Sequence, residues 1–113
     1  MKKSEPILWF KDIRLSHLNQ VGGKNASLGE LTHHLSSLGV KVPNGFAITA
    51  DAYSDFLAHN NLNVVIAQKL SLLSDGDLNK LTKIGNDIRE VIIQSAFPDE
   101  LTTAIIEAYS RLT

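Results

Sequence analysis

The sequence predicts an α+β fold that is mostly helical, with about five helices and two short strands. Apolar residues recur at three- and four-residue spacing in five segments, which is typical of helices that bury one face. Only two short runs, near residues 7–10 and 45–48, combine apolar, β-branched and aromatic residues as buried strands do. The length of 113 residues and the 43% apolar content predict one compact domain around one core.

The two predicted strands are short and lie far apart in the sequence. The first is Ile7–Phe10, bounded by Pro6 and by a charged pair. The second follows Pro43 and Gly45, which interrupt an apolar run, and ends at Ile48. Two strands alone form a marginal sheet, so we expect its other strands beyond Thr113 or on another molecule. An unfinished sheet edge also predicts that the chain can associate with itself.

The first two predicted helices have recognisable starts and ends. One follows the paired Gly22 and Gly23, and Gly39 provides its C-terminal cap; its apolar stripe is Leu28, Leu31, Leu35 and Leu38. The next begins near Ala50 with Thr49 as its cap and Asp51 in its first turn, and it fades at Asn60–Asn61. Its predicted buried side chains are Tyr53, Phe56 and Leu57.

Three more stripes at helical spacing complete the predicted elements. Ser74 and Asp77 resemble a capping box between the first and the second, and Pro98 is suited to the first position of the third. The stripes are Leu62, Ile66, Leu70 and Leu73; then Leu78, Leu81, Ile84, Ile88, Val91 and Ile92; then Leu101, Ile105, Ala108 and Leu112.

Composition argues against several classes of function. The 11 basic and 12 acidic residues are spread along the chain, so we expect no nucleic-acid partner. No apolar run approaches the roughly 18 residues needed to cross a bilayer, and the first residues do not resemble a secretory signal, which predicts no membrane partner and a cytoplasmic location. The absence of cysteine excludes disulfides, thiolate metal sites and cysteine nucleophiles.

The segment Gly22-Gly23-Lys24 has the parts of a phosphate site. Glycines allow close backbone approach, the first amides of the following helix point outward, and the lysine adds a mobile positive charge. It is not a P-loop, because Asn25 stands where Ser or Thr should follow the lysine and Leu18 stands where the first glycine should be. On spacing alone, an ordinary loop and helix cap explains the same residues.

A longer pattern resembles the ATP-binding domain of the pyruvate/phosphoenolpyruvate-dikinase family. The resemblance is carried by Val21–Leu31 and Leu38–Tyr53. Shorter runs at Ile7–Phe10, Ile88–Ile92 and Phe97–Leu101 extend it over nearly the whole chain. Within the family these runs are most similar to the enzymes that convert ATP, pyruvate and water to phosphoenolpyruvate, AMP and phosphate.

The resemblance implies that residues 1–113 are the N-terminal portion of an ATP-grasp-type domain. In the family, ATP phosphorylates a histidine on a separate domain, which then phosphorylates pyruvate, with Mg²⁺ required. It implies that Lys24 contacts the ATP phosphates and that Gly22 and Gly23 support them through the backbone. The phosphohistidine domain, the pyruvate-binding domain and the family's second phosphate-binding arginine have no counterpart here. We therefore expect no catalytic residue, no tight binding of ATP or Mg²⁺ to the isolated chain, and no activity of the isolated chain.

Other interpretations remain open from the sequence. The chain fits a non-catalytic helical interaction module, or the same segment of a pyruvate phosphate dikinase or an antibiotic phosphotransferase. A shortened and a naturally short chain are not distinguished. No metal site is expected, because His33 and His34 are adjacent on a helix and diverge by roughly 100°. Asp75-Gly76-Asp77 fits a turn and a cap rather than a calcium loop.

Overall fold

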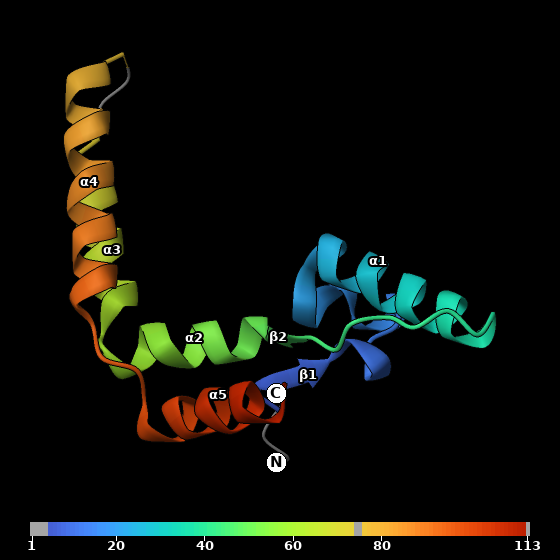
Figure 1. Ribbon diagram of the computed structural model, residues 1–113. Coiled ribbons are helices and arrows are strands. Elements are labelled where there is room, and N and C mark those ends of the chain that lie inside the picture. Colours follow the sequence, from blue (N-terminus) through green and yellow to red (C-terminus); the bar gives the residue numbers. More distant parts are fainter. Residues whose placement is uncertain (1–4, 74–75, 113) are drawn as a thin grey trace. The chain divides into compact units, whose positions relative to one another are not determined.

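The computed structural model describes residues 5–73 and 76–112, and the contacts divide them into two compact units. The first contains residues 5–54 and 99–112, and the second contains residues 55–98 apart from 74 and 75. The prediction of one core is therefore wrong. In chain order the elements are β1 (Ile7–Trp9), the 3-10 helices η1 (Phe10–Asp12) and η2 (Leu15–His17), α1 (Leu18–Ser37), β2 (Phe46–Ile48), α2 (Ala50–His59), α3 (Leu62–Leu70), α4 (Leu78–Gln94) and α5 (Asp99–Arg111) (Figure 1).

The predicted α+β class is confirmed, with five helices and a two-stranded sheet in the described part of the chain. The strands pair antiparallel, with Ile7 opposite Ile48 and Trp9 opposite Phe46. Side chains alternate between the two faces of a strand, so Leu8 and Ala47 share the face that packs toward Val21 and Ala26 of α1. The other face carries the Trp9 and Phe46 rings, whose centroids lie 5.3 Å apart.

The segment after β1 contributes a fully buried side chain to the core of the first unit, although no predicted element covers it. Ile13 is 0% exposed and joins the core with Val21, Ala26 and Ala47. Phe10 was predicted as the end of the strand but begins η1 instead. Its N–H still donates to Gly45 C=O at 3.0 Å, and its ring fills the space that a Cβ on Gly45 would occupy.

Helix α1 begins earlier than predicted and is interrupted once. Residues Leu18–Val21 are helical, Gly22 leaves the helical conformation, and the helix resumes and continues to Ser37. The predicted C-terminal glycine is confirmed: Gly39 has φ +80°, and the N–H groups of Gly39 and Val40 donate to the carbonyls of Ser36 and Leu35. These two bonds form the usual glycine-terminated helix end.

The predicted start of α2 is also confirmed, because the Ala52 N–H donates to the Thr49 hydroxyl at 3.2 Å. Among the side chains predicted to be buried, Phe56 is 5% exposed, whereas Tyr53 is 50% exposed, so the prediction for Tyr53 is wrong. The helix ends where expected, and Asn61 adopts a left-handed conformation with φ 55°.

In the second unit, α3 and α4 contact each other. Asp77 is the N-terminal cap of α4, accepting the Lys80 N–H at 3.0 Å, while the proposed partner Ser74 lies outside the described residues, as does Asp75. The Phe56 and Phe97 rings contact each other edge-on, with centroids 5.5 Å apart, and the Asn60 side chain donates to Ala96 C=O.

None of the helices in the described residues is both long enough and apolar enough to cross a membrane. The cytoplasmic location stays a prediction.

Candidate functional site

The break in α1 at Gly22 forms the turn that the sequence predicted for phosphate binding. Gly22 has φ +84° and ψ 166°, in the region where side chains with a Cβ are strained. No atom lies within 4 Å of the position that a Cβ would occupy, so the conformation rather than the space requires glycine. The Asn25 amide bridges the break, donating to Val21 C=O at 2.9 Å.

Gly23 and Lys24 begin the longer part of α1, and both are exposed. A Cβ on Gly23 would meet Leu18 Cδ1 at 3.8 Å, which is an ordinary contact, so neither conformation nor packing requires glycine there. The described part of the chain has ion pairs at Arg14–Glu30 and Lys83–Asp87, and neither involves Lys24. The predicted residues are thus adjacent on an open surface at a helix start.

The buried face of α1 packs against other residues of the first unit. Ala26 is 0% exposed, and Gly29 lies directly against Ile13. A Cβ on Gly29 would fall 2.4 Å from the Ile13 carbonyl oxygen and 2.6 Å from its Cγ2 atom, so only glycine allows this approach. Since Lys24 precedes these contacts by about one helical turn, they set the orientation of its helix.

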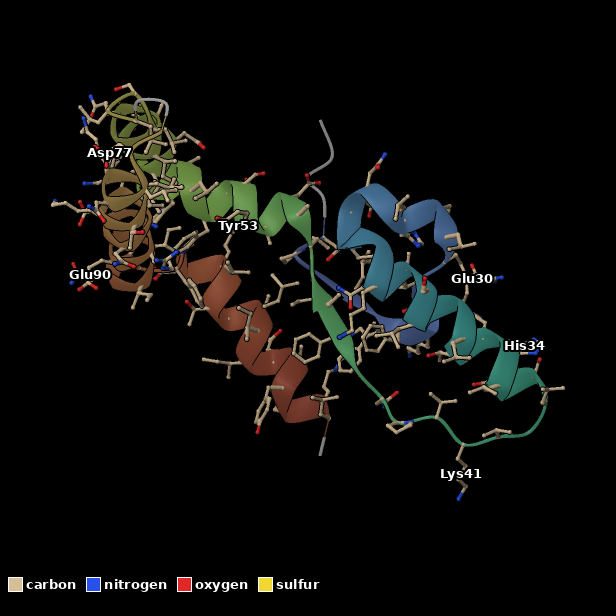
Figure 2. The ribbon with its side chains drawn as sticks, turned by 90° about the horizontal axis from the view of Figure 1, so that it is seen from above. Glu30, His34, Lys41, Tyr53, Asp77 and Glu90 are labelled. Carbon is tan, nitrogen blue, oxygen red and sulfur yellow. The ribbon has the colours of Figure 1, made fainter. Side chains whose placement is uncertain are left out.

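Glu30, labelled on α1 in Figure 2, forms an ion pair that links this helix to the segment before it. Its carboxylate accepts Arg14 Nε at 3.0 Å, Arg14 Nη2 at 3.2 Å and the Leu15 N–H at 2.8 Å. The hydrogen bond from Arg14, followed by that from Leu15, lowers the pKa of the Glu30 carboxyl. The same pair raises the pKa of Arg14 above its usual range.

Ile13, Arg14, Gly29 and Glu30 support the candidate site, although no site role was predicted for them. Gly29 offered one signal, because a glycine inside a helical pattern costs stability unless a close contact needs it. The isolated Ile13 in a polar stretch offered a second signal. Nothing in the local pattern indicated that Arg14 and Glu30, which are 16 positions apart, would pair.

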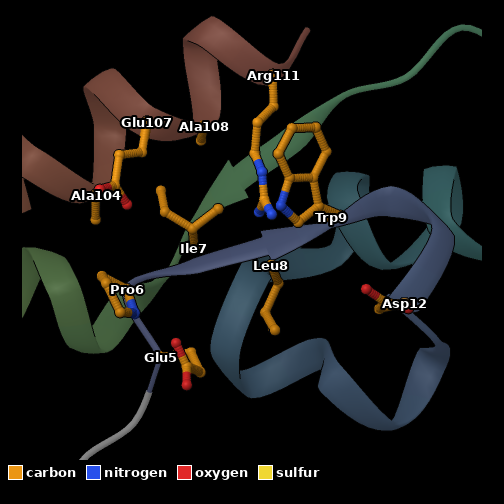
Figure 3. A pocket seen from close by; sticks show the side chains of 10 residues that line it. All are labelled: Glu5, Pro6, Ile7, Leu8, Trp9, Asp12, Ala104, Glu107, Ala108 and Arg111. Carbon is orange, nitrogen blue, oxygen red and sulfur yellow. The ribbon is translucent and has the colours of Figure 1, made fainter.

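Neither of two cavities in the first unit contains the predicted phosphate-binding residues. One, of about 350 Å³, lies between β1 and α5 (Figure 3), and the other, of about 380 Å³, adjoins it near Asn44. Gly22, Gly23 and Lys24 line neither of them. The turn with its exposed cation therefore lies outside both of these cavities.

Metal-ligating side chains do not converge near this turn. Across residues 5–73 and 76–112, no group of three histidines or acidic residues is placed to hold a metal ion. The Nδ1 atom of His17 accepts the Arg14 N–H at 3.0 Å, within the turn of η2. The Nε2 atom of His33 is buried and has no hydrogen-bond partner in the described part of the chain.

Comparison with known proteins gives consistent matches. The family model described as "Pyruvate phosphate dikinase, AMP/ATP-binding domain" matches residues 18–113. The phosphoenolpyruvate synthase of Escherichia coli is 45% identical over 107 residues, covering 95% of this chain and 14% of that protein. Those of Neisseria meningitidis and Aquifex aeolicus are 42% and 41% identical, covering 94% and 99% of this chain.

The chain spans only 13–14% of the length of these relatives. The family match nevertheless includes the turn at Gly22, the lysine after it and the five α-helices of the described residues, and it covers most of the chain. This chain belongs to the family of the pyruvate phosphate dikinase AMP/ATP-binding domain.

Proposed function

We propose that this chain supplies part of an ATP phosphate site, with Lys24 as its cation and the Gly22–Gly23 backbone beside it. The observation that carries the proposal is the left-handed Gly22 immediately before a helix on which Lys24 is exposed. A helix start directs N–H groups outward and favours negative charge, and a lysine in its first turn adds a full positive charge. Gly23, which the fold does not require, leaves room for an anion close to the backbone.

We further propose that the chain works as the N-terminal portion of a longer enzyme. The named relatives are phosphoenolpyruvate synthases. The proposed reaction of the longer enzyme is the one that the family resemblance implies, conversion of pyruvate, ATP and water to phosphoenolpyruvate, AMP and phosphate. Phosphoryl transfer requires several cationic groups around the transferring phosphate. The turn provides one of them, so the isolated chain is proposed to bind phosphate groups without completing the reaction.

The Mg²⁺ that accompanies ATP does not fit the residues near this turn. Lys24 and Asn25 follow the glycines; a lysine ammonium does not bind a cation, and the single amide oxygen of Asn25 is not the set of oxygen ligands that Mg²⁺ prefers. We therefore assign no step to the ion, and its ligands are proposed to lie elsewhere in the longer enzyme.

The direct test is a titration of the chain with ATP, followed by the NMR shifts of the Gly22, Gly23 and Lys24 amides. We expect these amides to shift with ATP and to shift less with AMP, because the site recognises the β- and γ-phosphates. Lys24→Ala should weaken ATP binding by about tenfold or more, the effect of losing one charge-assisted bond. Lys41→Ala is the matched control, because Lys41 is exposed on the loop after α1 (Figure 2). If Lys24→Ala and Lys41→Ala bound ATP with equal affinity, the proposal that Lys24 binds the ATP phosphates would be wrong.

A second candidate function, a helical interaction module, is supported by exposed apolar side chains on α4. Leu78 is 75% exposed and Ile93 is 78% exposed, far more than expected for core positions of an amphipathic helix. The two functions are distinguished by the same titration, since an interaction module alone predicts no specific shift at the Gly22 turn.

A further inference from the structure

The side chain of Asn25 bridges the break in α1, and the residues that it spans are those of the proposed phosphate site. Asn25 Nδ2 donates to Val21 C=O at 2.9 Å. Between these two bonded residues lie Gly22, Gly23 and Lys24, in that order. One hydrogen bond therefore closes a short loop that contains the whole glycine–lysine turn and no other residue.

The backbone at the break explains why a side-chain donor is needed there. In an unbroken helix each C=O accepts the N–H four residues later, and Gly22, with φ +84° and ψ 166°, departs from that geometry directly after Val21. Val21 is 9% exposed and belongs to the core, so its carbonyl has little access to water. A buried carbonyl without a donor destabilises the fold. The Asn25 amide supplies a donor, so the helix is broken at Gly22 without leaving this carbonyl unsatisfied.

The bond requires a donor at position 25, which the best helix-forming residues do not have. A carbonyl oxygen only accepts hydrogen bonds, so the amide group that faces it is the NH₂ of Asn25. An ionised aspartate has the same shape but only acceptor atoms, and alanine has no polar side-chain atom. Helix formation alone favours both of these residues, because negative charge is favoured in the first turn and alanine has the highest helix propensity. The asparagine is therefore explained by its bond across the break rather than by the helix.

The break also determines which groups Gly23 and Lys24 present to solvent. The helix resumes at Gly23, and the first N–H groups of a helix have no carbonyl one turn earlier to bind. Both residues are exposed. In a chain that stayed helical through Gly22, their N–H groups would donate to the carbonyls of Asn19 and Gln20 instead. A maintained break therefore keeps two N–H groups and the lysine ammonium available on one short segment.

We propose that Asn25 is a positioning residue of the phosphate site: its amide holds the break at Gly22, so that the N–H groups of Gly23 and Lys24 remain available to an anion. The inference rests on the proposed function of this turn and adds to it a residue that acts through the backbone rather than by touching ATP. It also accounts for an asparagine at the position where a P-loop has Ser or Thr.

The experiment compares Asn25→Ala with Asn19→Ala, a matched control whose side chain is exposed on the shorter part of the same helix. Without the bridging bond, the open turn is populated in a smaller fraction of molecules, and the apparent affinity falls by that fraction. Asn25→Ala should therefore bind ATP about tenfold more weakly, measured from the NMR shifts of the Gly23 and Lys24 amides. Asn19→Ala should bind ATP as the unchanged chain does.

Two further measurements need no ligand. The side-chain NH₂ of Asn25 should exchange its protons with water more slowly than that of Asn19, because it is hydrogen-bonded. Gly22→Ala should lower the midpoint temperature of thermal unfolding in the unchanged chain, and should lower it less when Asn25→Ala is also present, because nothing then holds residue 22 out of the helix.

Three results would each overturn the proposal: equal ATP affinities of Asn25→Ala and Asn19→Ala, simple addition of the Gly22→Ala and Asn25→Ala effects on the midpoint temperature, or equally fast exchange of the two side-chain NH₂ groups. Failure of the phosphate site itself has a different signature. In that case the Gly23 and Lys24 amides of the unchanged chain do not respond to ATP, while the coupling between positions 22 and 25 persists. Asn25 would then hold the turn without positioning it for a ligand.

Discussion

Helices α1 and α4 are the two longest helices of the described chain, and they bury very different residues. Helix α4 has the more regular apolar stripe, yet only Ile84 is fully buried, while Leu78, Leu81 and Ile93 are at least half exposed. Helix α1 is interrupted by Gly22, yet it buries Val21, Ala26 and Gly29. Small residues thus make the closest packing, and a long apolar stripe by itself does not show how much of a helix is buried.

The largest expected effect tests the burial difference within α4. Ile84→Ala removes a side chain that is 5% exposed and should lower the free energy of unfolding of its unit by about 3 kcal/mol, through lost burial and a residual cavity. Ile93→Ala is the matched control, because Ile93 is 78% exposed and its change should stay within about 0.5 kcal/mol. Urea denaturation followed by circular dichroism measures both. Similar losses for the two variants would mean that the apolar stripe is buried throughout.

The same substitution in the two helices should have opposite signs. Gly29→Ala places a Cβ against the Ile13 backbone and should destabilise the first unit by about 2 kcal/mol. Gly85→Ala in α4 would meet only the Arg89 side chain, at 3.5 Å, and should stabilise its helix by about 0.5 kcal/mol. Thermal unfolding of the two variants gives the comparison directly. If both were stabilised, the close approach of α1 to Ile13 would be wrong.

A third pair of substitutions separates the two glycines of the turn. Gly22→Ala forces a Cβ into a backbone conformation, φ +84° and ψ 166°, that is essentially restricted to glycine, and should cost about 2 kcal/mol. Gly23→Ala has no such strain and should leave stability equal or slightly raised, while its added methyl group reduces ATP binding if an anion approaches the backbone there. Denaturation and the ATP titration are needed together. If Gly23→Ala bound ATP as the unchanged chain does, the proposal that an anion lies close to the Gly23 backbone would be wrong.

The smallest expected effect concerns the Glu30 attachment, because this ion pair is exposed to solvent. The folded state lowers the pKa of Glu30, so its stabilising contribution is present above the ordinary carboxyl pKa of 4.5 and is lost as the pH falls through the lowered value. Glu30→Gln should therefore be slightly less stable than the unchanged chain at neutral pH and equal to it in strong acid. Thermal melts at a series of pH values test this. A difference that persists in acid would assign the effect to packing.

Most of the elements could be predicted from the sequence because their signals are local. Thr49 and Gly39 mark a helix start and a helix end through bonds to residues only three to five positions away. The turn at Gly22 was likewise predicted from adjacent residues. The packing of this turn's helix against Ile13 could not be predicted in this way, because Ile13 contacts Gly29 only after the chain has folded back.

Errors in predicted burial have the same origin. Tyr53 fits an apolar helical stripe, but whether a stripe position is covered depends on which other element packs there. The prediction of one core failed for a similar reason, since length and composition do not report how contacts divide between parts of a chain.

The five α-helices, the two strands, the caps of α2 and α4, the glycine turn and the family resemblance could be predicted from the sequence, because each depends on neighbouring residues or on a continuous motif. The burial of each side chain, the pairing of Arg14 with Glu30 and the cavity between β1 and α5 became known only from the folded chain. Those features depend on contacts between residues far apart in the chain, and local preferences carry no information about them.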